Sequence, residues 1–84
     1  MGLKVRLDWF DKQTEIADGQ EYSVDLGDDV SIIAALGLIS EPEIYDGGFD
    51  VLVAWIPDLQ RLFHHQIEPA DFDYQVAFRY RPIW

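Results

Sequence analysis

Four short stretches of this chain alternate between apolar and polar side chains, the pattern of a half-buried β-strand. The alternation is clearest in residues 3–10, where Leu3, Val5, Leu7 and Trp9 are separated by Lys4, Arg6 and Asp8. The same period of two runs through residues 21–26, 49–56 and 74–80. A chain of 84 residues that spends four segments in this way is expected to build its core on one antiparallel sheet.

The stretches between the predicted strands contain turn and helix signals. Asp18-Gly19 is typical of a turn before the second strand, and Pro57 is expected to end the third. Residues 30–36 favour a short helix that Asp28 or Asp29 caps and Gly37 ends. Residues 58–65 fit either a short helix or an irregular turn. The sequence therefore predicts an α+β domain over residues 1–84, a single four-stranded antiparallel sheet with one short helix.

The alternation also predicts which side chains share a sheet face. We expect the helix and loops to cover an apolar face made by Val5, Leu7, Trp9, Tyr22, Val24, Phe49, Val51, Val53, Trp55, Val76, Phe78 and Tyr80. The opposite face is expected to stay open for a partner and carries Lys4, Arg6, Asp8, Phe10, Glu21, Ser23, Asp25, Gly48, Asp50, Leu52, Gln75, Ala77 and Arg79. A shift of one residue in any strand would exchange its two faces.

Acidic residues are concentrated in one half of the sequence. Between Asp8 and Asp50 the chain has twelve acidic side chains and one basic one, Lys12, within a total net charge of −10. Gathering like charges opposes folding, but it speeds association with a basic partner. Binding to nucleic acid is disfavoured, because affinity for phosphates comes from Lys and Arg.

Composition excludes several other classes. The chain has no cysteine, so disulfides and thiolate metal sites are excluded, which suits a reducing cytoplasm. Charges at Lys4, Arg6 and Asp8 break the pattern of a signal peptide, and no apolar run is long enough to span a membrane. The acidic run 21–29 lacks the glycine and the final glutamate of a calcium loop. We therefore expect no metal and no cofactor.

The two histidines offer one route to catalysis. His65 and Glu68 are close enough in sequence to form an acid–base pair. The chain has no sequence signature of a nucleophile and no glycine-rich phosphate loop, so we expect no enzyme. A small enzyme using His65 and Glu68, and an acidic nucleic-acid mimic or adaptor that binds another basic protein, are the alternative hypotheses.

Several strings in the sequence resemble one family. MGLKVRLDWFDK, EYSVDLGDD and GGFDVLVAWIPDLQ followed by FHHQI are similar to the cloacin immunity family, which protects bacteria from ribonuclease-type colicins and cloacin. The resemblance implies a four-stranded antiparallel sheet with a short helix. It implies a cytoplasmic inhibitor that binds the basic C-terminal ribonuclease domain of a toxin through the open sheet face, keeps it off RNA, and leaves the cell in that complex.

The same resemblance implies a set of partner-binding residues. Phe10 matches an aromatic of the family, and acidic interface positions are matched or neighboured by Asp8, Glu15, Glu21, Asp25, Asp28 and Asp50. The sequence departs from the well-known members at Ala17, Gly48 and Gln75, where they carry an aromatic, a cysteine and an aromatic, and at Arg79, Arg81 and Pro82. These departures predict a cognate toxin different from the familiar ones.

Overall fold

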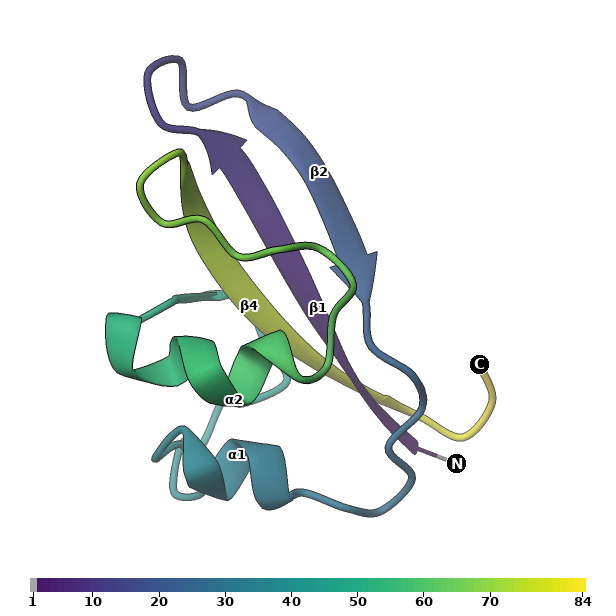
Figure 1. Cartoon of the computed structure of the whole chain (residues 1–84). Helices are drawn as coiled ribbons and strands as arrows, with labels where there is room; N and C mark the ends of the chain where they lie inside the picture. The colour runs from purple at the N-terminus through teal and green to yellow at the C-terminus, as the bar shows by residue number, and fades with distance from the viewer. Residues whose placement is uncertain (1) are drawn as a thin grey trace.

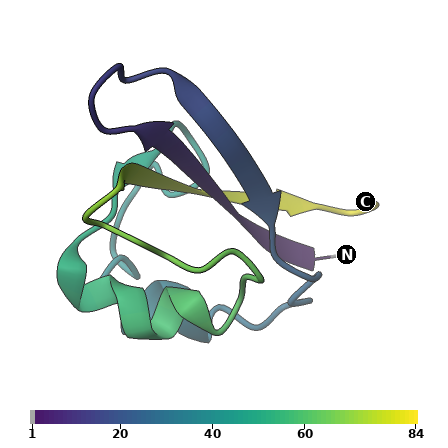
Figure 2. The ribbon, with the colours of Figure 1, turned by 45° about the horizontal axis from the view of Figure 1, so that its top comes forward.

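A computed structural model describes residues 2–84 of the chain. Its elements in chain order are β1 (Gly2–Asp11), β2 (Ala17–Tyr22), α1 (Ser31–Ala35), β3 (Phe49–Asp50), the 3-10 turn η1 (Val53–Trp55), α2 (Ile56–Gln60) and β4 (Phe72–Arg81). The four strands pair antiparallel in the order β2-β1-β4-β3. Both helices and the loop before β4 lie on one side of this sheet (Figures 1 and 2). The α+β fold with one open sheet face is confirmed.

The core lies between the sheet and the helices. Leu3, Val5 and Leu7 of β1 are fully buried, and Val76 and Phe78 of β4 lie beside them in the paired register. The helices contribute Ile32, Ile33, Leu36 and Leu59 to the same apolar cluster. The alternation in β1 therefore has the predicted direction, with Lys4, Arg6, Asp8 and Phe10 on the opposite, open face.

The short helix α1 ends at the predicted glycine, but the predicted aspartate cap is wrong, because the N-cap position is Val30 and makes no side-chain cap hydrogen bond. The Asp29 carboxylate accepts a hydrogen bond from the Ser31 N–H at 2.9 Å. After the helix, Gly37 takes a positive φ of 77°. This left-handed residue lets the N–H groups of residues 37 and 38 bond the carbonyls of Ala34 and Ile33, the paired pattern of a glycine-terminated helix.

The first hairpin differs from its prediction. Asp18 and Gly19 lie inside β2, and the chain turns at residues 12–16. The Asp11 carboxylate accepts the Gln13 and Thr14 N–H groups at 2.9 Å each, which satisfies the turn. The Asp11 side chain therefore stabilises the turn of this hairpin, and Asp18-Gly19 does not.

The faces of the second strand are consequently exchanged relative to the prediction. Glu21 pairs with Leu7 and so points to the covered face, while Tyr22 and Val24 are 40% and 74% exposed. Ser23 is buried at 3% exposed, where its hydroxyl accepts the Val5 N–H at 3.0 Å. Polar side chains lie on the covered side here because backbone N–H groups form hydrogen bonds with them. The alternation of apolar and polar residues carries no information about such partners.

The third predicted strand is also mostly wrong. Only Phe49 and Asp50 pair with β4, and the chain then enters η1 and α2. Pro57 lies in the first turn of α2, where a missing N–H leaves no hydrogen bond unmade, so it starts a helix there. Val53, expected on the covered face, is 77% exposed, and Trp55 is half-buried against the core.

Candidate functional site

The open face of the sheet brings side chains of all four strands into cross-strand rows. One row runs Gln20–Asp8–Gln75–Asp50, because Asp8 pairs with both Gln20 and Gln75, and Gln75 pairs with Asp50. The next row is Ala17–Phe10–Asp73. Residues far apart in the sequence therefore form one continuous surface.

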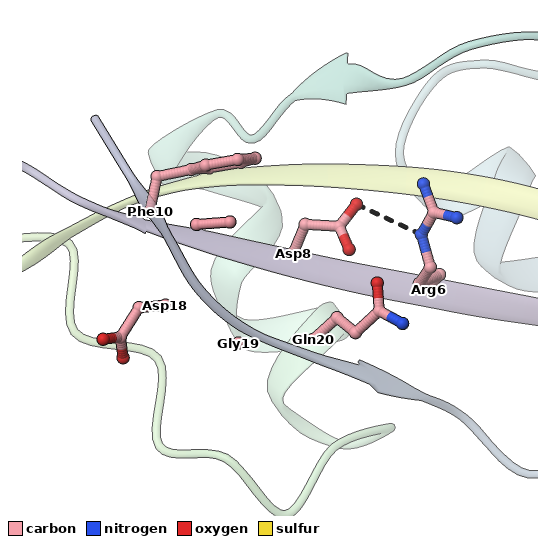
Figure 3. A pocket seen from close by; sticks show the side chains of 7 residues that line it. Arg6, Asp8, Phe10, Asp18, Gly19 and Gln20 are labelled. Carbon is pink, nitrogen blue, oxygen red and sulfur yellow. Dashed lines mark hydrogen bonds and ion pairs between the residues drawn. The ribbon is translucent and has the colours of Figure 1, made fainter.

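Phe10 lies between two shallow grooves of this surface. A groove of about 450 Å³ on the β2 side is lined by Arg6, Asp8, Phe10 and Ala17, with residues 18–20. A second groove of about 350 Å³ is lined by Phe10, Glu15, Asp50 and Gln75, with residues 51, 73 and 74. Figure 3 shows Arg6, Asp8 and Phe10 on the same side of β1, with Gln20 beside them and Asp18 pointing away. A half-buried phenyl ring with a groove on each side is a suitable anchor for a protein partner.

Carboxylates surround this ring, and we name the surface formed by Asp8, Glu15, Asp50 and Asp73 around Phe10 the acidic half of the open face. Arg6 pairs with Asp8 at 3.1 Å, and Lys12 pairs with Asp73 at 2.8 Å. A hydrogen bond to Asp73 raises the pKa of Glu15, while Lys12 and Glu15 together lower the pKa of Asp73. Two carboxylates that shift each other's pKa, one of them paired with a lysine, lie close enough to concentrate negative potential here.

The remaining acidic positions of the predicted interface lie elsewhere. The Glu21 carboxylate is on the covered face and accepts the His64 and His65 N–H groups at 2.8 and 2.9 Å. Asp25 accepts the Gly27 N–H at 2.8 Å, and Asp28 accepts the Tyr80 hydroxyl. Within residues 2–84, no three or more His, Asp and Glu side chains are placed to hold a metal ion. The structure thus brings together Asp8, Phe10, Glu15, Ala17, Gly48, Asp50 and Gln75, but not Glu21, Asp25 and Asp28.

Gln20 and Asp73 belong to the acidic half or its border but were not predicted. Gln20 was missed because the turn was placed at Asp18-Gly19, and Asp73 because β4 begins two residues before the predicted strand. The Asx turn at Asp11 is the sequence signal that would have corrected the hairpin.

A family model described as cloacin immunity protein matches residues 2–81 of the chain. The chain belongs to the cloacin immunity protein family. It is therefore a bacteriocin immunity protein, an inhibitor whose family binds a cognate cloacin or colicin toxin. None of the helices in residues 2–84 has the length and apolar character needed to cross a membrane.

Ala17, Gly48 and Gln75, the three partner-binding positions where the resemblance implies a change of side chain, lie together on the open face. Ala17 pairs with Phe10 across the strands. Gln75 lies between Asp8 and Asp50 and donates to the Asp50 carboxylate at 3.3 Å. A Cβ atom at Gly48 would lie 3.4 Å from the Gln75 side-chain oxygen. Small or polar side chains therefore lie around Phe10 on this face.

His65 of the immunity protein has a packing role on the covered face. Its ring stacks on Trp9 at 3.8 Å between ring centres and 7° between planes. Its Nε2 atom lies 2.9 Å from the Tyr74 hydroxyl, which also accepts the Glu68 N–H at 2.8 Å. Tyr74, and not the Glu68 carboxylate, is thus the polar partner of His65, which differs from the acid–base pairing considered from the sequence.

Proposed function

We propose that this immunity protein binds and inhibits the basic ribonuclease domain of its cognate colicin- or cloacin-type toxin. The acidic half of the open face would dock on that domain in a 1:1 complex, in the cytoplasm of the producing cell. The bound inhibitor would keep the nuclease off its RNA target by bulk and by negative charge. The partner-binding residues in this proposal are Asp8, Phe10, Glu15, Ala17, Gly48, Asp50 and Gln75.

One observation carries the proposal. Four carboxylates from β1, the first turn, β3 and β4 converge around a half-buried phenyl ring on a face that the protein's own helices and loops leave open. An aromatic anchor ringed by charge is the composition of a protein interface hot spot. A cationic protein surface complements it, because opposite potentials speed encounter and select the register.

The test is calorimetric titration into isolated ribonuclease domains from a panel of colicin- and cloacin-type toxins, with RNA cleavage measured on the same samples. The expected result is one domain bound tightly at a 1:1 ratio and inhibited in proportion. Tight binding to a nuclease that stays fully active would contradict inhibition. Equal binding to unrelated basic proteins such as lysozyme would favour the nucleic-acid mimic instead.

A further inference from the structure

The open face has a second half with the opposite charge. The antiparallel register pairs Lys4 with Arg79 and Gly2 with Arg81, and Arg6 occupies the next open-face position of β1. Four of the six lysines and arginines in a chain of net charge −10 therefore gather at one end of a single sheet face. We name this surface, formed by Lys4, Arg6, Arg79 and Arg81, the basic half.

Most of these cations have no carboxylate partner within the chain. Arg6 pairs with Asp8 at the boundary between the two halves. Arg79 donates to the carbonyl oxygens of Tyr45 and Phe78 at 3.3 and 2.9 Å. Across residues 2–84 the side-chain ion pairs are Arg6–Asp8 and Lys12–Asp73, so Lys4, Arg79 and Arg81 keep their charges uncompensated by a direct partner. The Asp25 carboxylate lies where a side chain on Gly2 would stand, so it is an acid at this end of the face, but it forms no ion pair with Lys4, Arg79 or Arg81.

The C-terminal residue arranges the basic half. After β4 the chain turns, and its C-terminal end lies near the N-terminal end (Figure 1). The Trp84 indole N–H donates to the Gly2 carbonyl at 2.8 Å. The Lys4 ammonium and the Arg81 guanidinium lie 4.8 and 4.9 Å from the centre of the indole ring. Tyr22 lies against the same ring at 6.1 Å. Cation–π contact with one indole ring therefore holds the charged groups of Lys4 and Arg81 side by side at this end of the face.

The composition of the basic half matches that of an interface anchor. Trp84 and Tyr22 remain 36% and 40% exposed, and they stand among arginines. Trp, Tyr and Arg are the residues most enriched in interface hot spots. About six residues of strand separate Lys4 from Phe10, roughly 20 Å, which exceeds the Debye length of about 8 Å at physiological salt. The two halves meet at the Arg6–Asp8 pair, but the cations around Lys4 and the carboxylates around Phe10 are far enough apart to make separate electrostatic contacts.

We infer that the basic half docks on a carboxylate-bearing patch of the cognate toxin, next to the basic patch that the acidic half contacts. This inference rests on the proposed function and extends it to the chemistry of the partner surface. The toxin would present positive and negative patches about 20 Å apart along the direction of β1. Such a two-sign contact sets the orientation of the complex, because a reversed pose would oppose like charges at both ends.

Reversing charges in the basic half distinguishes a direct contact with the toxin from long-range electrostatic attraction. The double variant Lys4→Glu/Arg79→Glu is compared with Arg61→Glu, an exposed cation on the helix side of the molecule. Both make an acidic protein more acidic, so long-range attraction to a basic toxin alone would leave affinity unchanged or raise it in both. The inference predicts that the double variant loses affinity for the ribonuclease domain bound by the wild type roughly tenfold or more, mainly through faster dissociation, whereas Arg61→Glu does not.

Thermal unfolding verifies that the variants fold. If Lys4→Glu/Arg79→Glu does not fold, the neutral double variant Lys4→Gln/Arg79→Gln takes its place in the same titration. Unchanged or higher affinity in the folded double variant overturns the inference while the proposed function stands. A wild-type protein that inhibits no toxin nuclease contradicts the proposed function and the inference with it. If the variants abolish self-association in sedimentation but leave toxin affinity unchanged, the basic half meets a second copy of this chain, and the inference is wrong.

Discussion

Phe10 is the residue on which the acidic half is centred. It lines both grooves of the open face and projects on the side opposite to the buried Leu7 and the half-buried Trp9. Replacing Phe10 by Ala should weaken binding of the cognate ribonuclease domain by about 2 kcal/mol or more, roughly thirtyfold, because a central aromatic anchor is lost. Calorimetric titration with the wild type and the variant measures the change.

The matched control for this prediction is Ile39→Ala, which also truncates an apolar side chain but at a position 63% exposed in the loop after α1, away from the open face. We expect its affinity to equal that of the wild type. Thermal unfolding of both variants separates loss of contact from loss of fold. An affinity of Phe10→Ala within about threefold of the wild type would remove Phe10 from the interface.

Glu21 fixes the loop after α2 to the sheet. Its carboxylate accepts two backbone N–H groups, from His64 and His65. Burial raises the pKa of Glu21, but these two hydrogen bonds outweigh it, and the pKa lies below its ordinary value of 4.5. Glu21→Gln leaves one oxygen for two donors, so we expect the free energy of unfolding to fall by about 1–3 kcal/mol at neutral pH.

The pH dependence of that loss follows from the lowered pKa. A carboxylate whose pKa is lower in the folded state stabilises the fold above its unfolded pKa, and the stabilisation is lost as pH falls through the folded pKa. The difference between wild type and Glu21→Gln should thus be full above about pH 5 and shrink toward pH 3. Denaturant unfolding at both pH values measures it. A difference that stayed constant with pH would show that the Glu21 charge is unimportant.

At the scale of elements, the β1–β2 hairpin depends on a close approach between Gly19 and Trp9. A Cβ atom on residue 19 would lie 2.5 Å from the Trp9 ring, and that ring stacks on His65 from the loop between α2 and β4. Gly19→Ala should therefore displace a packed indole and destabilise the fold by about 1–3 kcal/mol. Thermal or denaturant unfolding measures the loss.

Gly48→Ala is the matched control, since the nearest atom to its added Cβ lies at an ordinary 3.4 Å. We expect that variant to unfold within about 0.5 kcal/mol of the wild type. Equal stability of the two alanine variants would show that the Trp9 ring moves aside without cost. Because Gly48 lies beside Gln75, its variant also reports whether added bulk there changes toxin affinity.

Elements with local signals were predictable from the sequence, and those decided by distant contacts were not. β1 and β4 follow from strict alternation, and the end of α1 follows from its C-terminal glycine, whereas the predicted aspartate cap of α1 is not formed. Asp18-Gly19 imitates a turn, but Gly19 is required because Trp9 packs over it. The run 49–56 has the alternation of a strand, yet only Phe49 and Asp50 pair with β4. The rest forms η1 and the start of α2, where Pro57 is tolerated in the first turn. Phe10 was assigned correctly to the open face because its neighbour Trp9 belongs to the other.

The whole molecule combines a strong negative field with a face of two signs. The net charge of −10 acts at long range and attracts any basic protein. The arrangement on the open face acts at contact distance and differs between its two ends. In the proposed complex, attraction and recognition would depend on different charges, so changes in salt or in single acids should affect association and dissociation differently.

Salt should slow association with the ribonuclease domain far more than it speeds dissociation. Between roughly 50 and 500 mM NaCl the Debye length falls from about 14 to about 4 Å, so the association rate constant should drop by about tenfold or more while dissociation changes by less than about threefold. Stopped-flow mixing measures both.

Asp50→Asn and Asp46→Asn each remove one exposed acid, from the open face and from the loop before β3. Both should slow low-salt association slightly, because steering depends on the total field, but only Asp50→Asn should speed dissociation. An association rate independent of salt would contradict electrostatic steering, and equal dissociation rates for the two variants would place Asp50 outside the contact.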